Sequence, residues 1–252
     1  MNKKSNVLLT GATSGVGYAT AMQLLSNPDR FNVFVTGRAP DRLYELQNEG
    51  ATAIPCDVTK AEEIDRLLAA IGHLDIVIFS AGLGKFAAAH EIEDDTIQSM
   101  MDVNVIAPMI MTKRLLPKMM ERRGGHLIYI GSQAGKVATP KASIYAATKH
   151  AVIGYTNALR MEVAPYHIDV SVVHPGPIDT PFLDKADQTG AYRTSVGNHL
   201  LEVDRVADAL IKLIDKPVRE INLPAIMGIT SKLYAMAPAF IEKAGKKYFY
   251  KK

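Results

Sequence analysis

Apolar and polar positions follow two alternating patterns along this chain of 252 residues. Short apolar runs rich in β-branched residues predict strands, and they lie at Asn6–Thr10, Asn32–Thr36, Ala51–Cys56, Ile76–Ser80, His126–Gly131, Ile168–His174 and Arg219–Leu223. Between them, apolar residues recur at helical spacing, which predicts helices near Val16–Leu25, Asp41–Gln47, Ala61–Ile71, Asp94–Arg122, Ser143–Ala164 and Val203–Lys216. Strands that alternate with helices predict an α/β fold, a doubly wound parallel sheet of about seven strands flanked by helices.

Composition narrows the class of protein. The chain is 48% hydrophobic and 22% charged, which is typical of a soluble globular protein with a large core, and its net charge of +3 is too small to indicate nucleic-acid binding. A single cysteine, Cys56, excludes an internal disulfide framework and fits a reducing compartment. We find neither a signal peptide before the first strand nor an apolar run of membrane-spanning length. We therefore expect one domain over residues 1–252 and a cytoplasmic location.

The first strand runs into a glycine-rich turn, Thr10-Gly11-Ala12-Thr13-Ser14-Gly15-Val16-Gly17, and then into a helix. Backbone N–H groups at the start of a helix lack internal partners, and the helix dipole adds positive potential there. A pyrophosphate therefore fits this position, although an ordinary strand-to-helix connection can carry the same glycines. The turn lacks the Gly-Lys-Ser/Thr ending of a nucleoside triphosphate loop, which disfavours ATP or GTP hydrolysis.

A second motif, Tyr145-Ala146-Ala147-Thr148-Lys149, places a phenol and an ammonium four residues apart on one face of a helix. A nearby ammonium favours the phenolate, so we expect Lys149 to lower the pKa of Tyr145 toward the range useful for proton transfer. Solvated helices also carry this spacing. Ser132, however, ends a predicted strand and presents a hydroxyl at the same sheet edge, where it can bond a substrate carbonyl.

The glycine turn, Ser132, Tyr145 and Lys149, in this order and spacing, make the chain resemble the short-chain dehydrogenase/reductase family, in its branch of single-domain enzymes with a Rossmann fold. The likeness covers about residues 5–224. The resemblance implies that Tyr145 is the acid/base, that Lys149 also bonds the nicotinamide ribose, and that Ser132 polarises the substrate oxygen. Asn104 matches an asparagine that supports a proton relay, although taken alone it fits a structural residue inside a helix.

The resemblance also implies a set of cofactor-binding residues, some with plainer interpretations. Asp57 could instead be a helix N-cap, Ser80 stands where the family usually has asparagine, and the Pro175–Thr180 segment is also a simple turn. No metal site is predicted. The expected cofactor-binding residues are Gly11, Thr13, Ser14, Gly15, Val16, Gly17, Arg38, Asp57, Val58, Ser80, Ala81, Gly82, Asn104, Tyr145, Lys149, Pro175, Gly176, Ile178 and Thr180.

The end of the second predicted strand indicates which nicotinamide cofactor, NAD(H) or NADP(H), is bound. Sites specific for NAD place a carboxylate there for the ribose 2′-OH, whereas a basic residue suits a 2′-phosphate. This strand ends Val35-Thr36-Gly37-Arg38, with no acid and with an arginine that can pair with phosphate or face solvent. We predict NADP(H) over NAD(H).

Two segments are expected to vary with function. Residues 181–201 lie where a substrate lid is expected, and residues 229–252 form a C-terminal helical extension that ends in a basic, aromatic tail. That extension could cover the substrate pocket, contact another subunit, or lie on an anionic membrane surface. We favour packing or a subunit contact over peripheral membrane contact.

The sequence thus predicts an NADP-dependent oxidoreductase that interconverts a carbonyl and an alcohol on a small organic substrate. Two alternatives remain: a nucleotide-binding regulatory or scaffold protein without turnover, and a nucleotide-sugar epimerase or dehydratase. The serine, tyrosine and lysine set argues against the first, and the short substrate region argues against the second. The resemblance also implies a homodimer or homotetramer.

Overall fold

The strands build a single sheet in the computed structural model, which describes residues 4–187, 189–197 and 200–246. Within these residues all seven strands are parallel, in the order β3-β2-β1-β4-β5-β6-β7. The strands are β1 Ser5–Thr10, β2 Phe31–Thr36, β3 Thr52–Ala53, β4 Ile76–Phe79, β5 Gly125–Ile130, β6 Ile168–Pro175 and β7 Glu220–Leu223. The order turns back between β1 and β4, where open α/β sheets bind ligands. The predicted fold class is confirmed.

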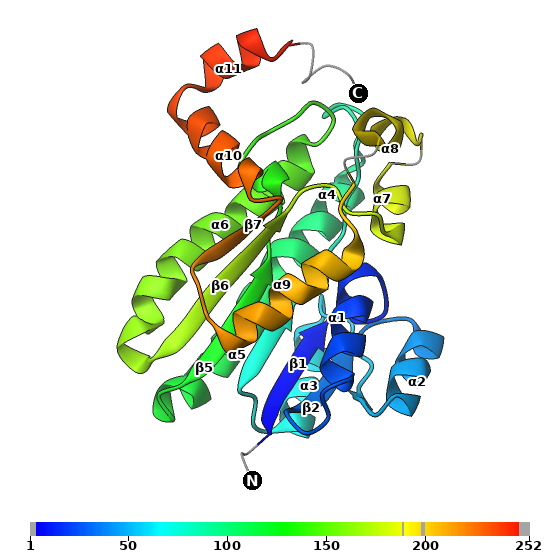
Figure 1. The fold of residues 1–252 in the computed structure, drawn as a ribbon. Coiled ribbons are helices and arrows are strands. Elements are labelled where there is room, and N and C mark those ends of the chain that lie inside the picture. Colours follow the sequence, from blue (N-terminus) through cyan, green and yellow to red (C-terminus); the bar gives the residue numbers. More distant parts are fainter. Residues whose placement is uncertain (1–3, 188, 198–199, 247–252) are drawn as a thin grey trace.

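Helices cover both faces of the sheet (Figure 1). Helices α1, α2 and α9 pack on one face, and α3, α5 and α6 pack on the other. The main helices are α1 Gly15–Leu25, α2 Pro40–Asn48, α3 Ala61–Ile71, α4 Asp94–Met101, α5 Ala107–Glu121, α6 Ser143–Val163 and α9 Val203–Asp215. Their ends lie close to the predicted bounds, apart from the long helix discussed below.

Alternation along each strand divides the core into two layers. Val7 and Leu9 of β1 point into the layer with α1 and α9, whereas Leu8 between them points into the layer with α5 and α6. Successive side chains of a strand face opposite sides of the sheet, so a continuous apolar run can fill both layers. The carboxyl ends of the strands are thereby fixed side by side.

The third strand is shorter than predicted. We expected Ala51–Cys56, but the ladder with β2 holds only Thr52–Ala53. Pro55 has no N–H to donate to a ladder, although the chain still runs beside β2 through bonds from Ile54 N to Val35 O and from Cys56 N to Gly37 O. This edge segment therefore continues toward Asp57 without regular pairing.

The predicted helix Asp94–Arg122 is interrupted. Between α4 and α5 lies one π-helical turn, Asp102–Ile106, in which the Ala107 N–H bonds the Asp102 carbonyl. Pro108 lacks the N–H that would bond residue 104 in a regular α-helix, which favours the wider turn. Such turns often occur at functional positions, and this one contains Asn104.

The segments after β6 and β7 lie at the end of the sheet where the strands terminate (Figure 1). The expected lid contains two short helices, α7 Pro181–Ala186 and α8 Ala191–Val196. The C-terminal extension begins slightly earlier than predicted, with α10 Ile226–Met236 followed by α11 Pro238–Ala244. Most of the basic tail, residues 247–252, lies outside the described residues. No helix in the described part is long and apolar enough to cross a bilayer.

Candidate active site

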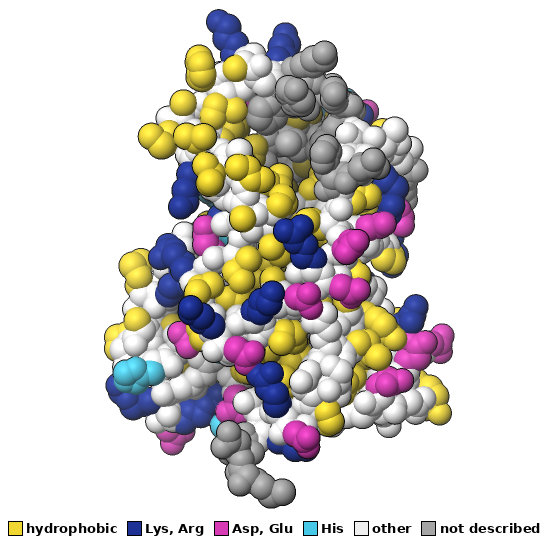
Figure 2. All heavy atoms as spheres, in the orientation of Figure 1, with side chains coloured by type: hydrophobic (Ala, Val, Ile, Leu, Met, Phe, Trp, Pro, Cys, Tyr) yellow, Lys and Arg dark blue, Asp and Glu magenta, His cyan; other side chains and the backbone are white. Residues whose placement is uncertain are grey.

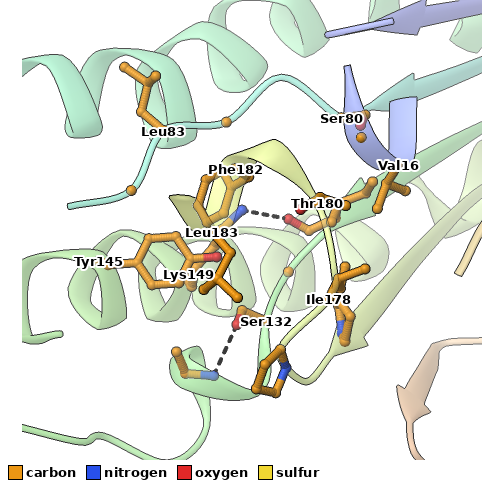
Figure 3. Close-up of a pocket in the computed structure, with 18 of the residues that line it drawn as sticks. Val16, Ser80, Leu83, Ser132, Tyr145, Lys149, Ile178, Thr180, Phe182 and Leu183 are labelled. Atoms are coloured by element: carbon orange, nitrogen blue, oxygen red, sulfur yellow. Dashed lines mark hydrogen bonds between the residues drawn. The ribbon is translucent and has the colours of Figure 1, made fainter. Parts of the chain in front are cut away.

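A deep cavity opens at the carboxyl ends of the strands. Its volume is about 940 Å³, near the upper end of the range of about 300–1,000 Å³ typical of ligand pockets. Its walls come from the glycine turn, the ends of β2, β4, β5 and β6, the start of α6, the lid and the C-terminal helices. Segments from the whole length of the chain therefore meet at one site (Figure 3).

The glycine turn at the start of α1 fits an anion. Ser14 precedes the helix, and its hydroxyl caps none of the N–H groups of the first turn, so these donors can bind a ligand. Gly11 has a positive φ of 65°, and a Cβ there would lie 2.6 Å from the Ala81 backbone. A side chain at Gly17 would lie 2.2 Å from the Gly11 carbonyl oxygen. These glycines hold the turn tightly against the helix and against the end of β4.

The end of β2 forms another part of the cavity wall, with Gly37 and the exposed Arg38. A Cβ at Gly37 would lie 2.5 Å from Thr13 Cγ2, so the carboxylate expected in an NAD site would require Thr13 to move. Burial acts to raise the pKa of Asp57, but hydrogen bonds from Thr59 and, to a smaller extent, the charge of Arg38 lower it overall. Arg38 therefore supplies a cation beside Asp57 at this end of the cavity.

Nearly all residues that the sequence assigned to the cofactor line this one cavity. They are Gly11, Thr13, Ser14, Gly15, Val16, Arg38, Asp57, Val58, Ser80, Ala81, Gly82, Tyr145, Lys149, Pro175, Gly176, Ile178 and Thr180. The two that do not are Gly17, which serves the packing of the turn, and Asn104, which lies behind the wall. The residues expected to bind the cofactor thus meet in one cavity, although they lie far apart in sequence.

Ser132 and Tyr145 face the same part of the cavity (Figure 3). Ser132 follows β5 and caps the short 3-10 turn Gln133–Gly135, its oxygen accepting the Ala134 N–H at 3.1 Å. Its hydroxyl also interacts with the phenol of Tyr145. Tyr145 lies in the first turn of α6 and is largely buried.

The protonation of Tyr145 differs from the expectation. Burial raises the pKa of Tyr145 to about 12, and the Ser132 hydroxyl offsets only part of that rise. Lys149 does not contribute the expected lowering, because its amine bonds the Ile130 carbonyl and lies over the Tyr145 ring, 5.8 Å from the ring centroid. In this state Tyr145 is a protonated donor at neutral pH.

Lys149 is also buried, and its amine donates a hydrogen bond to the Ile130 carbonyl across 2.8 Å. Burial without a carboxylate partner lowers the pKa of Lys149 to about 8, since desolvation disfavours the charged form. The amine therefore titrates close to physiological pH. It connects α6 to the strand that precedes Ser132.

Asn104 has a structural position in the π-helical turn. Its amide oxygen accepts the Leu83 N–H, and its amide nitrogen donates to the Leu83 carbonyl, both at 2.8 Å. The nitrogen also bonds the Thr148 hydroxyl at 3.0 Å. Asn104 thus fastens the loop after β4 to the helix of Tyr145 and Lys149, and this geometry makes it a positioning residue rather than a direct contact.

A partly buried polar network lies behind Ser132. The Gln133 amide donates to the His174 carbonyl and to Asn222, and Lys136 donates to Asn222 and pairs with Glu220 at 2.9 Å. These bonds tie the 3-10 turn to β6 and β7. Charge-assisted bonds of this kind are stronger than neutral ones, so the network stabilises the turn that presents Ser132.

Several lining residues were not found from the sequence. Phe182 and Tyr192 lie within the expected lid, but nothing in the pattern singled them out. Phe86, in the loop after β4, and Met227, Tyr234 and Ile241 of the C-terminal helices also line the cavity. These residues meet only in the folded chain, and no local spacing in the sequence links them.

Comparison with known proteins agrees with this geometry. The family model for short chain dehydrogenases matches residues 5–190. An uncharacterised oxidoreductase of Staphylococcus aureus (strain MRSA252) is 34% identical over 227 residues, covering 87% of this chain and 94% of that protein. The chain therefore belongs to the short-chain dehydrogenase/reductase family, whose members are oxidoreductases acting on CH–OH groups.

Solved structures resemble the fold closely. The closed form of serine dehydrogenase complexed with NADP⁺ superposes with a TM-score of 0.79 at 29% identity, covering 86% of this chain and 93% of that one. The 3-ketoacyl-(acyl-carrier-protein) reductase of Brucella melitensis complexed with NADH superposes with a TM-score of 0.76 at 26% identity. The match covers 86% of this chain and 96% of that one. Both nicotinamide cofactors therefore occur among similar structures.

Proposed function

We propose that this protein is an NADP-dependent oxidoreductase that interconverts a carbonyl and an alcohol on a small organic substrate, with Tyr145 as the acid/base. The observation that supports this most is the meeting of Ser132, Tyr145 and Lys149 in the cavity that also contains the glycine turn. A pure binding protein has no need of such a proton-transfer group.

Each polar side chain at the site has its own role in the proposed reaction. When bound, the nicotinamide supplies or accepts the hydride. In the reducing direction Ser132 donates a hydrogen bond to the substrate oxygen, and Tyr145 gives its phenolic proton to that oxygen. The raised pKa of Tyr145 suits this direction, because the phenol is protonated before the reaction. Lys149 holds a positive charge near the phenolate that results.

The preference for NADP(H) rests on the end of β2. Arg38 can bond a 2′-phosphate in a charge-assisted way, and Thr13 occupies the space that a side chain at position 37 would need. NAD(H) specificity would require a carboxylate in this region. Arg38 is thus the residue that we assign to the 2′-phosphate.

The proposal is tested by following NADPH and NADH absorbance with a panel of ketones, aldehydes and alcohols. Substrate-dependent oxidation of NADPH, faster than that of NADH, is expected. Binding of NADPH without any turnover would favour the regulatory or scaffold alternative. Conversion of a nucleotide-sugar with no net oxidation would favour the epimerase alternative.

We also propose that copies of the chain associate through the helices on the α5 and α6 side of the sheet. The resemblance to the family implies this contact, and Met161 on α6 is 73% exposed and Ile106 on the π-helical turn 42% exposed on that side of the sheet. Sedimentation of the wild type is expected to give a dimer or tetramer, and Met161→Glu is expected to shift it toward the monomer.

A further inference from the structure

The cavity continues beyond Tyr145 into a compartment enclosed by the lid and the C-terminal helices. Phe182 of α7 and Tyr192 of α8 line it on one side, and Met227 of α10 and Ile241 of α11 line it on another. The Phe86 N–H donates to the Ala186 carbonyl at 2.8 Å, which joins the loop after β4 to the lid. The loop after β4 and the lid therefore form one continuous wall.

Aromatic rings surround the phenol of Tyr145. The Phe86 ring lies edge-on to Tyr145 with centroids 5.8 Å apart, and edge-on to Tyr192 at 5.0 Å. Phe182 lies 5.8 Å from Tyr145 on another side (Figure 3). Rings at these separations give a stable apolar wall, so the body of a substrate whose oxygen meets Tyr145 would touch mostly carbon.

Few charged groups line the cavity. Among the described lining residues the charged ones are Arg38, Asp57, Lys149 and Lys185. Arg38 and Asp57 stand at the far end of the cavity, and Lys149 bonds Ile130. Lys185, three residues after Phe182 on α7, lines the cavity with an exposed side chain. A carboxylate or phosphate on the substrate body would lose its hydration against these apolar walls.

Resting on the proposed function, we propose that the substrate is an uncharged ketone or aldehyde with a bulky apolar body, and that α10 and α11 help to select it. The carbonyl carbon gains the hydride from NADPH, the carbonyl oxygen gains the proton of Tyr145, and NADP⁺ and an alcohol result. Apolar burial against the rings and the C-terminal helices supplies the selectivity.

The two sides of the C-terminal helices provide a matched control. Ile241 lines the cavity, whereas its neighbour Phe240 is 72% exposed and does not line it. Other large apolar side chains, Ile229, Leu233 and Met236, are also exposed on these helices and give the outer surface much of its apolar character (Figure 2). A general disturbance of α11 would follow from either substitution, but a change in substrate contact only from Ile241.

The test compares kcat/KM for acetophenone, acetone and a carboxylated acetophenone. The wild type is expected to prefer acetophenone over the other two by about tenfold or more, since one to a few methylene groups are worth roughly 10–200-fold in a hydrophobic pocket. Ile241→Ala and Met227→Ala should each lower kcat/KM for acetophenone several-fold through KM, with acetone unchanged. Phe240→Ala should leave all three values unchanged.

A preference for acetone or for the carboxylated ketone would overturn this inference while leaving the proposed function intact. Equal effects of Ile241→Ala and Phe240→Ala would overturn the role of α11. If NADPH is oxidised with none of the ketones, the proposed function fails separately. Calorimetric titration of the NADP⁺ complex with acetophenone then decides: affinity that Ile241→Ala weakens supports the apolar compartment, and absence of binding overturns it.

Discussion

The Lys149 amine reaches past Tyr145 to the carbonyl oxygen of Ile130, which it bonds across 2.8 Å. Ile130 ends the strand that precedes Ser132, so this bond joins the helix of the proton donor to the strand of the hydroxyl. The lysine thus holds a defined place in the site, although it does not lower the pKa of Tyr145 as the sequence predicted.

The lowered pKa of Lys149 predicts a pH dependence. With a pKa of about 8, the amine is charged below that pH and neutral above it. We expect kcat/KM for ketone reduction to be level near neutrality and to fall as the pH rises through about 8, because the bond from the amine to the Ile130 carbonyl weakens when the amine loses its charge. Lys149→Met should have low activity, and its kcat/KM should not fall as the pH rises through about 8. A pH profile of kcat/KM for both proteins provides the measurement. The same fall in the variant would contradict the assignment of this pH dependence to Lys149.

Arg38 should discriminate between the two cofactors. Arg38→Ala is expected to weaken NADP⁺ binding by roughly tenfold or more, because a hydrogen bond to a charged group contributes about 1.5–3 kcal/mol. NAD⁺, which lacks the 2′-phosphate, should bind almost as before. Calorimetric dissociation constants for both nucleotides provide the measurement. Equal losses would show that Arg38 does not meet the phosphate.

Asn104 should contribute to stability as well as to activity. Asn104→Ala removes a side chain that bonds Leu83 twice and Thr148 once. The free energy of unfolding is expected to fall by about 1–3 kcal/mol, because buried polar partners are left unsatisfied. Urea unfolding measures this loss. Thr148→Ser, which keeps a hydroxyl for Asn104, serves as the control and should lose much less; an equal loss would contradict the role of this bond.

The sequence predicted those features that depend on residues close to one another along the chain. The glycine turn and the Tyr145–Lys149 spacing each span only a few residues, and the continuous apolar run of β1 indicated a strand. The fold class and most helix bounds followed from such patterns, because strand and helix periodicities differ along the chain itself.

The remaining features depend on contacts between distant segments. The pKa of Tyr145 is set by burial, by the Ser132 hydroxyl and by the electrostatic effect of Tyr192, and no local spacing relates Tyr192 to Tyr145. The π-helical turn at Asn104 left only the weak signal of Pro108. Ile241 lines the cavity only because of the path that the chain takes after β7, which the sequence pattern does not predict.

The central claim is tested most directly by Tyr145→Phe, with turnover measured from NADPH absorbance and NADP⁺ affinity measured by calorimetry. The substitution removes only the phenolic oxygen, so we predict that kcat falls by about 10²–10⁴-fold, the usual contribution of general acid catalysis, while the dissociation constant for NADP⁺ stays unchanged. A variant that reduces ketones at the wild-type rate would contradict the assignment of Tyr145 as the proton donor.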